Sequence, residues 1–167
     1  MLYNVYESIF PLEDFHDEYM ILKTGAGWRF CGNSAAGNED TTFWFNDLSQ
    51  KSYYTNFLFN RIQDITGEKY NLNGVYANGQ TYGLCGDMHI DSIDPRAKTL
   101  IIYMNPVWNS VWGGATVFHK ENKIESYIPV PNNGILFNSN VSHYGSEPTR
   151  HCKELRITVA YKLQLKE

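Results

Sequence analysis

The chain has 167 residues, of which 43% are hydrophobic, 15% aromatic and 19% charged, so it suits one domain and is too short for two of ordinary size. Its formal net charge is −4 and it carries no basic cluster, which argues against a nucleic-acid partner, since such proteins meet phosphates with lysine and arginine. No apolar run reaches the roughly 20 residues of a membrane helix, and the first residues lack the pattern of a signal peptide.

The N-terminal part, up to about residue 70, is expected to be a mixed α/β support for the rest of the chain. Phe10–Phe15 is interpreted as a turn, and the small, polar Gly32–Asp40 segment as a surface loop. Apolar side chains then recur at steps of three and four residues, which predicts a helix over about Ser49–Thr66 that ends at Gly67. The residues that set this period are Phe57, Leu58, Ile62 and Ile65.

From Tyr70 onward the hydrophobic period changes to two, which is typical of β-strands. A helix followed by many short antiparallel strands predicts a mainly β fold, with a double-stranded β-helix (jelly-roll, cupin-like) core and helices packed on one sheet. The whole chain, 1–167, would be a single domain with its jelly-roll core over about 71–165. The predicted strands are Leu72–Tyr76, Met88–Asp91, Thr99–Asn105, Ala115–Phe118, Lys123–Ile128, Gly134–Asn138 and Leu155–Leu163.

Three polar residues of the β half suggest a metal site. His89 and Asp91 are two residues apart, so an extended segment would point both side chains to the same face. With His143 as a third donor they would form a 2-His-1-carboxylate triad, which holds Fe(II) on one side and leaves the other side open. A structural His–Asp pair is the competing interpretation, and His119, which we expect at the surface, is the competing third ligand.

Several further motifs, which follow one another along the chain from about Tyr76 to Leu163, extend this pattern over more than half of its length. Together they resemble the Fe(II)- and 2-oxoglutarate-dependent dioxygenases, in particular the prolyl-4-hydroxylase-like branch. The motifs are Tyr82-Gly83, His89-Ile90-Asp91, Ile101-Ile102-Tyr103-Met104-Asn105, Trp112-Gly113-Gly114, His143 and Arg156-Ile157-Thr158.

The resemblance implies roles for individual residues. His89, Asp91 and His143 would be the catalytic iron ligands. Arg156 would pair with the distal carboxylate of 2-oxoglutarate, a task that suits its planar and permanently charged fork. Tyr103 and Thr158 would also bind the cosubstrate. Tyr76, Gln80 and Tyr82 are expected to line the cosubstrate or substrate pocket, with aromatic packing and turn roles as the alternative.

The implied reaction is hydroxylation of a substrate C–H bond with release of succinate and CO2. The implied cofactors are Fe(II), 2-oxoglutarate and O2, with ascorbate as an accessory reductant. A prolyl residue of a peptide or protein is the leading substrate. Prolyl hydroxylases of this branch commonly carry an aromatic residue at the position of Lys162, so another peptide side chain or a small molecule stays open. Gly32–Asp40 and Trp108–Trp112 are the candidate segments for substrate contact.

Other functions remain as alternatives. The main one is a non-catalytic jelly-roll module that binds a metal or ligand, and the weaker ones are a nucleic-acid demethylase and a zinc hydrolase. Cys31, Cys85 and Cys152 are odd in number and share no short spacing, so we expect no disulfide framework and a reducing compartment, the cytoplasm. Neither a nucleic acid nor a membrane is expected as a partner, and the oligomeric state stays open.

Overall fold

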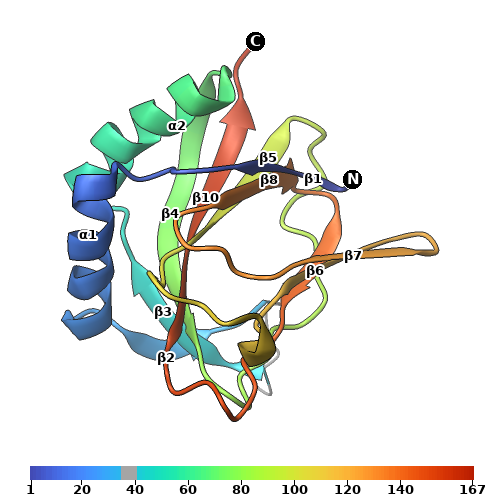
Figure 1. Ribbon diagram of the computed structural model, residues 1–167. Coiled ribbons are helices and arrows are strands. Elements are labelled where there is room, and N and C mark those ends of the chain that lie inside the picture. The colour runs from blue at the N-terminus through green and yellow to red at the C-terminus, as the bar shows by residue number, and fades with distance from the viewer. Residues whose placement is uncertain (35–40) are drawn as a thin grey trace.

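The computed structural model, which describes residues 1–34 and 41–167, contains two antiparallel β-sheets and a helical layer (Figure 1). The larger sheet has the strand order β1 (Tyr3–Tyr6), β8 (Gly134–Asn138), β5 (Ala97–Tyr103), β10 (Arg156–Leu165), β4 (Tyr70–Gln80), β3 (Phe43–Asp47), β2 (Arg29–Gly32). The smaller sheet has the order β7 (Lys123–Tyr127), β6 (Thr116–Lys120), β9 (Ser142–Gly145). The helical elements are α1 (Leu12–Thr24), the π-helical segment η2 (Tyr53–Leu58), α2 (Phe59–Thr66) and the 3-10 turn η3 (Ser110–Trp112).

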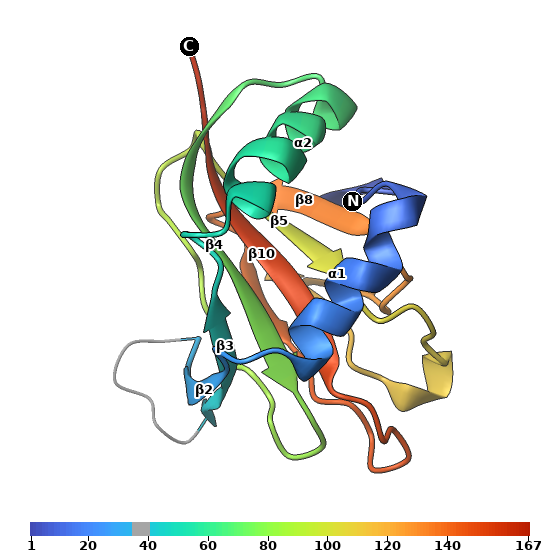
Figure 2. The ribbon, with the colours of Figure 1, turned by 90° about the vertical axis from the view of Figure 1, so that its left-hand side faces the viewer.

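The helices pack against one face of the larger sheet, as Figure 2 shows. Helix α1 buries Phe15, Tyr19 and Leu22, which follow one another at steps of four and three residues and so share one helical face. Helix α2 ends at Gly67, which adopts a left-handed φ of 72°. This helical layer and the sheet enclose the main hydrophobic core.

Strand β10 divides the molecule between this core and the functional side. Its residues Ile157, Val159, Tyr161 and Leu163 lie in the core under the helices. The alternate residues, from Arg156 to Lys162, line a cavity on the opposite face. The packed sheet therefore holds the polar side chains of Arg156, Thr158 and Lys162 on a rigid support.

A second, smaller core lies between the two sheets and contains Tyr103, Phe118, Ile135, Phe137 and Val141. Phe118 packs edge-on against Phe137, with ring centroids 4.9 Å apart. This aromatic cluster fills one part of the space between the sheets and leaves the remainder to the cavity.

The predicted mainly β jelly roll with helices on one sheet is confirmed. The local differences are informative. Met88–Asp91 is not a strand, because only His89 makes an isolated bridge, with His143. Phe10–Phe15 is not a simple turn but leads into the unpredicted helix α1, and β4 continues to Gln80, four residues beyond its predicted end.

The helix predicted over Ser49–Thr66 is present as η2 followed by α2. The predicted Gly32–Asp40 loop starts at the last residue of β2, and its residues 35–40 lie outside the described residues. Within the part of the chain that the structure describes, no helix is long and apolar enough to cross a membrane.

Candidate active site

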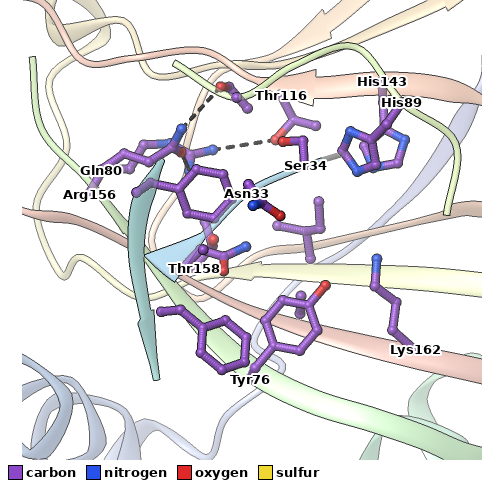
Figure 3. Close-up of a pocket in the computed structure, with 18 of the residues that line it drawn as sticks. Asn33, Ser34, Tyr76, Gln80, His89, Thr116, His143, Arg156, Thr158 and Lys162 are labelled. Carbon is purple, nitrogen blue, oxygen red and sulfur yellow. Dashed lines mark hydrogen bonds between the residues drawn. The ribbon is translucent and has the colours of Figure 1, made fainter. Parts of the chain in front are cut away.

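A cavity of about 380 Å³ opens between the two sheets (Figure 3). Paired residues of neighbouring strands lie side by side, so they form successive layers along the wall of the cavity. Arg156 of β10 pairs with Gln80 of β4, and six residues later Lys162 pairs with Thr99 of β5. One cation therefore lies toward each end of the cavity, and smaller or aromatic side chains line the space between them.

Three potential metal donors meet at the end of the cavity near Lys162. One ligand atom from each of His89, Asp91 and His143 lies within 4.8 Å of the others. The backbone holds the two distant segments together, because His89 and His143 exchange hydrogen bonds of 3.0 and 2.9 Å. The Asp91 N–H donates to the Ser139 carbonyl at 2.8 Å, which fixes the carboxylate beside the two rings.

Both imidazole rings are oriented as metal ligands would be. His89 Nδ1 lies 2.8 Å from the Asp87 carbonyl oxygen, and His143 Nδ1 lies 2.9 Å from the Val141 carbonyl oxygen. A carbonyl oxygen only accepts, so each Nδ1 carries the proton and each Nε2 keeps a free lone pair. The Nε2 atoms of His89 and His143 face Asp91 at 3.3 and 3.5 Å. The donor set thus fits a divalent transition metal such as Fe(II).

The electrostatics of this cluster favour the same protonation states. Burial lowers the pKa of His143 to about 4, so the ring is neutral at neutral pH, as a metal ligand must be. Burial raises the pKa of Asp91, but the positive charge of Lys162 beside the carboxylate lowers it, and the net pKa lies well below its ordinary value. The Asp91 carboxylate is therefore ionised at every physiological pH.

Asp91 has two further partners. The Thr99 hydroxyl donates to Asp91 Oδ2 at 2.6 Å, and the Lys162 ammonium forms an ion pair with the same oxygen. The Thr99 hydroxyl also lies 3.0 Å from the Ser139 hydroxyl, so the threonine is itself held in place. These contacts fix the orientation of the carboxylate.

Arg156 forms the opposite end of the cavity and is only 2% exposed. Its Nε donates to the Gly114 carbonyl at 2.6 Å, and its two terminal nitrogens donate to Gln80 Oε1 at 2.8 Å and to Thr116 Oγ1 at 3.4 Å. All three acceptors are neutral, and among residues 1–34 and 41–167 no carboxylate forms an ion pair with Arg156.

A buried cation without a counter-charge is costly, and burial accordingly lowers the pKa of Arg156. Three of the five N–H groups of its guanidinium have acceptors, so two remain to bind a ligand. This end of the cavity is built to receive an anion, and a carboxylate would match the planar fork.

The structure brings most of the residues singled out in the sequence to this cavity. Thr158 and Tyr76 line it together with Arg156 and the two histidines. Tyr103 lies behind the lining, where its hydroxyl is 2.8 Å from Thr116 Oγ1 and its ring lies 5.6 Å from the Arg156 guanidinium carbon. It therefore touches the anion-binding end through Arg156 and Thr116.

Two residues lie elsewhere. Tyr82, expected to line the cosubstrate or substrate pocket, follows the end of β4, is 54% exposed and packs against the Arg150 guanidinium, with the charge 5.4 Å from the ring centre. His119, the alternative ligand, is on β6, next to Tyr144 and outside the donor cluster. The β-strand alternation explains this, because Phe118 points inward and its neighbour His119 points outward.

Sequence reasoning did not find several residues that complete the site. Asn78 lies in the layer of Thr158, and its Oδ1 is buried without a hydrogen-bond partner, a vacancy that a ligand donor would fill. Thr99 and Thr116 support Asp91 and Arg156 from other strands. Continuing the two-residue period of strand β4 beyond its predicted end would have predicted that Asn78 faces the cavity. Nothing in the local sequence marks the two threonines.

Comparison with known proteins identifies the superfamily. The family model described as the 2OG-Fe(II) oxygenase superfamily matches residues 75–161, which is more than half of the chain. Comparison with curated protein sequences gives no significant match.

Solved structures agree with this fold. A prolyl hydroxylase from Trichoplax adhaerens, in complex with a hypoxia-inducible-factor peptide fragment, has a TM-score of 0.72 at 17% identity, covering 98% of this chain and 83% of its own. A Pseudomonas putida prolyl-4-hydroxylase has a TM-score of 0.71 at 12% identity, covering 99% and 94%. The α-ketoglutarate-dependent epimerase SnoN of nogalamycin biosynthesis has a TM-score of 0.70 at 11% identity, covering 98% and 77%. By sequence and fold, the chain belongs to the 2OG-Fe(II) oxygenase superfamily.

Proposed function

We propose that the protein hydroxylates a C–H bond of its substrate and converts 2-oxoglutarate to succinate and CO2. In this proposal His89, Asp91 and His143 hold Fe(II), and Arg156 binds the distal carboxylate of 2-oxoglutarate. One observation carries it: a single cavity has a donor set of two neutral nitrogens and a carboxylate at one end, and a buried arginine without a counter-ion toward the other.

Bound Fe(II) would supply the chemistry that activates O2 and 2-oxoglutarate. The two carbonyl oxygens that accept from the histidines keep each Nε2 free to coordinate. Gln80, Thr116 and the Gly114 carbonyl hold the guanidinium of Arg156, so that it meets the cosubstrate carboxylate without rearranging.

The cavity wall supports the same division of labour. Thr158 adds a hydroxyl donor in the layer between the two ends. Phe43, Phe45 and Ile101 supply apolar wall, which keeps bulk water from the reacting groups.

Proline is the reference substrate, because two of the similar structures are named prolyl hydroxylases and one of them carries a peptide. The third similar structure is named an epimerase, so the fold serves other substrates as well. A peptide or a small molecule would reach the metal end where His89 and Lys162 are partly exposed.

The test measures succinate formation from 2-oxoglutarate in the presence of Fe(II), ascorbate and O2. The wild-type protein is expected to form succinate, and His143→Ala to lose about 100-fold or more of that activity, because it removes a ligand. His119→Ala is the matched control, since it removes an imidazole outside the donor cluster, and it is expected to keep full activity.

Full consumption of 2-oxoglutarate by His143→Ala would overturn the ligand assignment. The competing function, a binding module without turnover, gives a different result: the wild-type protein would bind Mn(II) and 2-oxoglutarate in calorimetry and form no succinate with Fe(II).

A further inference from the structure

Lys162 is a charged residue at the metal end of the cavity that the reaction outlined above does not use. It lies on β10, six residues after Arg156 and on the same face of the strand. Figure 3 shows its side chain on the same wall of the cavity as Tyr76. The Lys162 Nζ lies 5.8 Å from the centre of the Tyr76 ring and forms an ion pair with Asp91 Oδ2.

The ammonium of Lys162 has room for another partner. Its side chain is 24% exposed, on the cavity side of the sheet. Of its three N–H donors, Asp91 Oδ2 takes one and the Tyr76 hydroxyl interacts with a second. Among residues 1–34 and 41–167, Asp91 is the one acidic side chain at ion-pair distance from it.

The charges of the described residues that line or contact the cavity leave Lys162 without full compensation. Asp91 carries one negative charge, while Arg156 and Lys162 carry one positive charge each, and the two histidines count as neutral ligands, with Nδ1 held by a backbone carbonyl and Nε2 free to coordinate. Fe(II) adds two positive charges and 2-oxoglutarate removes two, so one positive charge remains. Because Arg156 meets the distal carboxylate of the cosubstrate, the remaining charge is at the metal end.

An uncompensated charge in a partly closed cavity attracts an anion, and the interaction is stronger there than in bulk water. An apolar or aromatic residue in place of Lys162 would leave the same cavity neutral and would suit an uncharged substrate. The position of the lysine is also fixed, since its contact with Asp91 keeps it beside the metal ligands.

We infer that Lys162 is a specificity-determining residue that binds a carboxylate of the substrate, with the Tyr76 hydroxyl as a second donor. This inference rests on the proposed function. Because the Lys162 ammonium touches a metal ligand, the bound carboxylate lies close to the metal, and the hydroxylated carbon lies within a few bonds of it. The substrate class is a carboxylic acid, either an acidic side chain of a peptide or a small free acid.

The test compares pairs of probes that differ only in carboxylate against carboxamide. Blocked pentapeptides with a central Asp or Asn, and with a central Glu or Gln, represent acidic side chains. N-acetyl-L-proline and N-acetyl-L-prolinamide, together with succinamate and succinamide, represent small acids. Calorimetry with protein loaded with Mn(II) and 2-oxoglutarate gives each dissociation constant without turnover.

For at least one pair, the wild-type protein is expected to bind the carboxylate about tenfold more tightly than the carboxamide, which is the size of one charge-assisted hydrogen bond. Lys162→Met is expected to reduce this ratio to about threefold or less, while Lys162→Arg preserves the preference. Lys120→Met, which removes an exposed lysine of β6, is the matched control and is expected to keep the wild-type ratio. The probe pair that shows the carboxylate preference identifies the substrate as either an acidic peptide side chain or a small free acid.

The affinities for Mn(II) and 2-oxoglutarate are measured for every variant, and Lys162→Gln replaces Lys162→Met if the latter does not fold. If the wild-type protein binds 2-oxoglutarate but prefers no carboxylate probe, or if Lys162→Met keeps the preference, the inference is wrong and the proposed function stands. A tenfold loss of 2-oxoglutarate affinity in Lys162→Met with an unchanged probe ratio would assign the lysine to the cosubstrate and overturn the inference. If the wild-type protein binds neither Mn(II) nor 2-oxoglutarate, the proposed function fails and the inference falls with it.

Discussion

The Thr99 hydroxyl donates a 2.6 Å hydrogen bond to Asp91 Oδ2, and Thr99 is completely buried. The bond links strand β5 to the loop that carries the carboxylate and limits the rotation of that carboxylate. Thr99→Val keeps the shape of the side chain and removes only the hydroxyl. Because partners of metal ligands orient them, we expect Mn(II) affinity to fall about 10- to 100-fold in calorimetry.

Thr55→Val is the control for this substitution, because the Thr55 hydroxyl bonds the Lys51 carbonyl in a helix on the far side of the sheet. It is expected to bind Mn(II) as the wild-type protein does. Equal Mn(II) affinity of Thr99→Val and the wild-type protein would show that Asp91 does not need the Thr99 hydroxyl to keep its orientation.

The Gly113-Gly114 pair offers an internal comparison at the arginine end of the cavity. Both residues have positive φ angles, of 68° and 71°, which strain an L side chain, so alanine at either position should lower the free energy of unfolding by about 1–3 kcal/mol. A Cβ on Gly114 would lie 2.9 Å from Arg156 Cδ, whereas a Cβ on Gly113 would lie 3.4 Å from Thr149 Cγ2. Gly114→Ala should therefore displace the guanidinium and weaken 2-oxoglutarate binding about tenfold, measured by calorimetry with Mn(II)-loaded protein.

Gly113→Ala serves as the control, with a similar loss of stability and unchanged binding of 2-oxoglutarate. If both variants lost the same affinity, the effect would come from backbone strain and not from contact with Arg156.

The parts of the site that were predictable from the sequence depend on local geometry. Alternation along one strand places Arg156 and Thr158 on one face, and it requires no knowledge of neighbouring strands. The His89–Asp91 spacing also predicted a shared direction, although the segment is not a regular strand. There the backbone bonds of His89 to His143 and of Asp91 to Ser139 produce the alignment.

The parts that were not predictable depend on register between distant strands. Thr99 reaches Asp91, and Thr116 reaches Arg156, only because the sheets bring separate segments together. Tyr82 differs in another way: its motif directly follows β4 in sequence, but its exposed side chain lies outside the cavity lining, so its expected role stays a prediction. Helix α1 was not predicted although Tyr19 and Leu22 have helical spacing, because Pro11 lies in the segment interpreted as a turn, whereas it in fact precedes the first helical turn.

The low pKa of His143 predicts how the stability of the metal-free protein changes with pH. The pKa is about 4 in the folded protein, because of burial, and 6.5 in the unfolded chain. Between these values the unfolded chain binds a proton that the folded protein does not, so stability falls as the pH falls from 6.5 to 4. The expected slope is about 1.4 kcal/mol of unfolding free energy per pH unit from this residue.

Urea unfolding of the metal-free protein at pH 4.5, 5.5 and 6.5 measures this slope. Over the same range, the slope for His143→Gln should be smaller by about 1.4 kcal/mol per pH unit, which corresponds to one proton. The depressed pKa of Asp91 acts in a separate window, because its contribution is lost only below the unfolded value of 3.8. Equal slopes for the two proteins would mean that His143 titrates normally in the fold.

The absence of a counter-ion at Arg156 predicts that 2-oxoglutarate stabilises the protein through this residue. At 100 times its dissociation constant, a ligand that binds only the folded state adds about 2.7 kcal/mol, which corresponds to a rise in Tm of about 5–10 °C for a chain of this size. Arg156→Gln should abolish this shift in the Mn(II)-loaded protein. Arg150→Gln, which removes an exposed guanidinium beside Tyr82, should retain it. Glutarate, which has both carboxylates but no keto group, should still shift the Tm of the wild-type protein, because Arg156 binds the carboxylate alone; no shift with either diacid would place the anion site elsewhere.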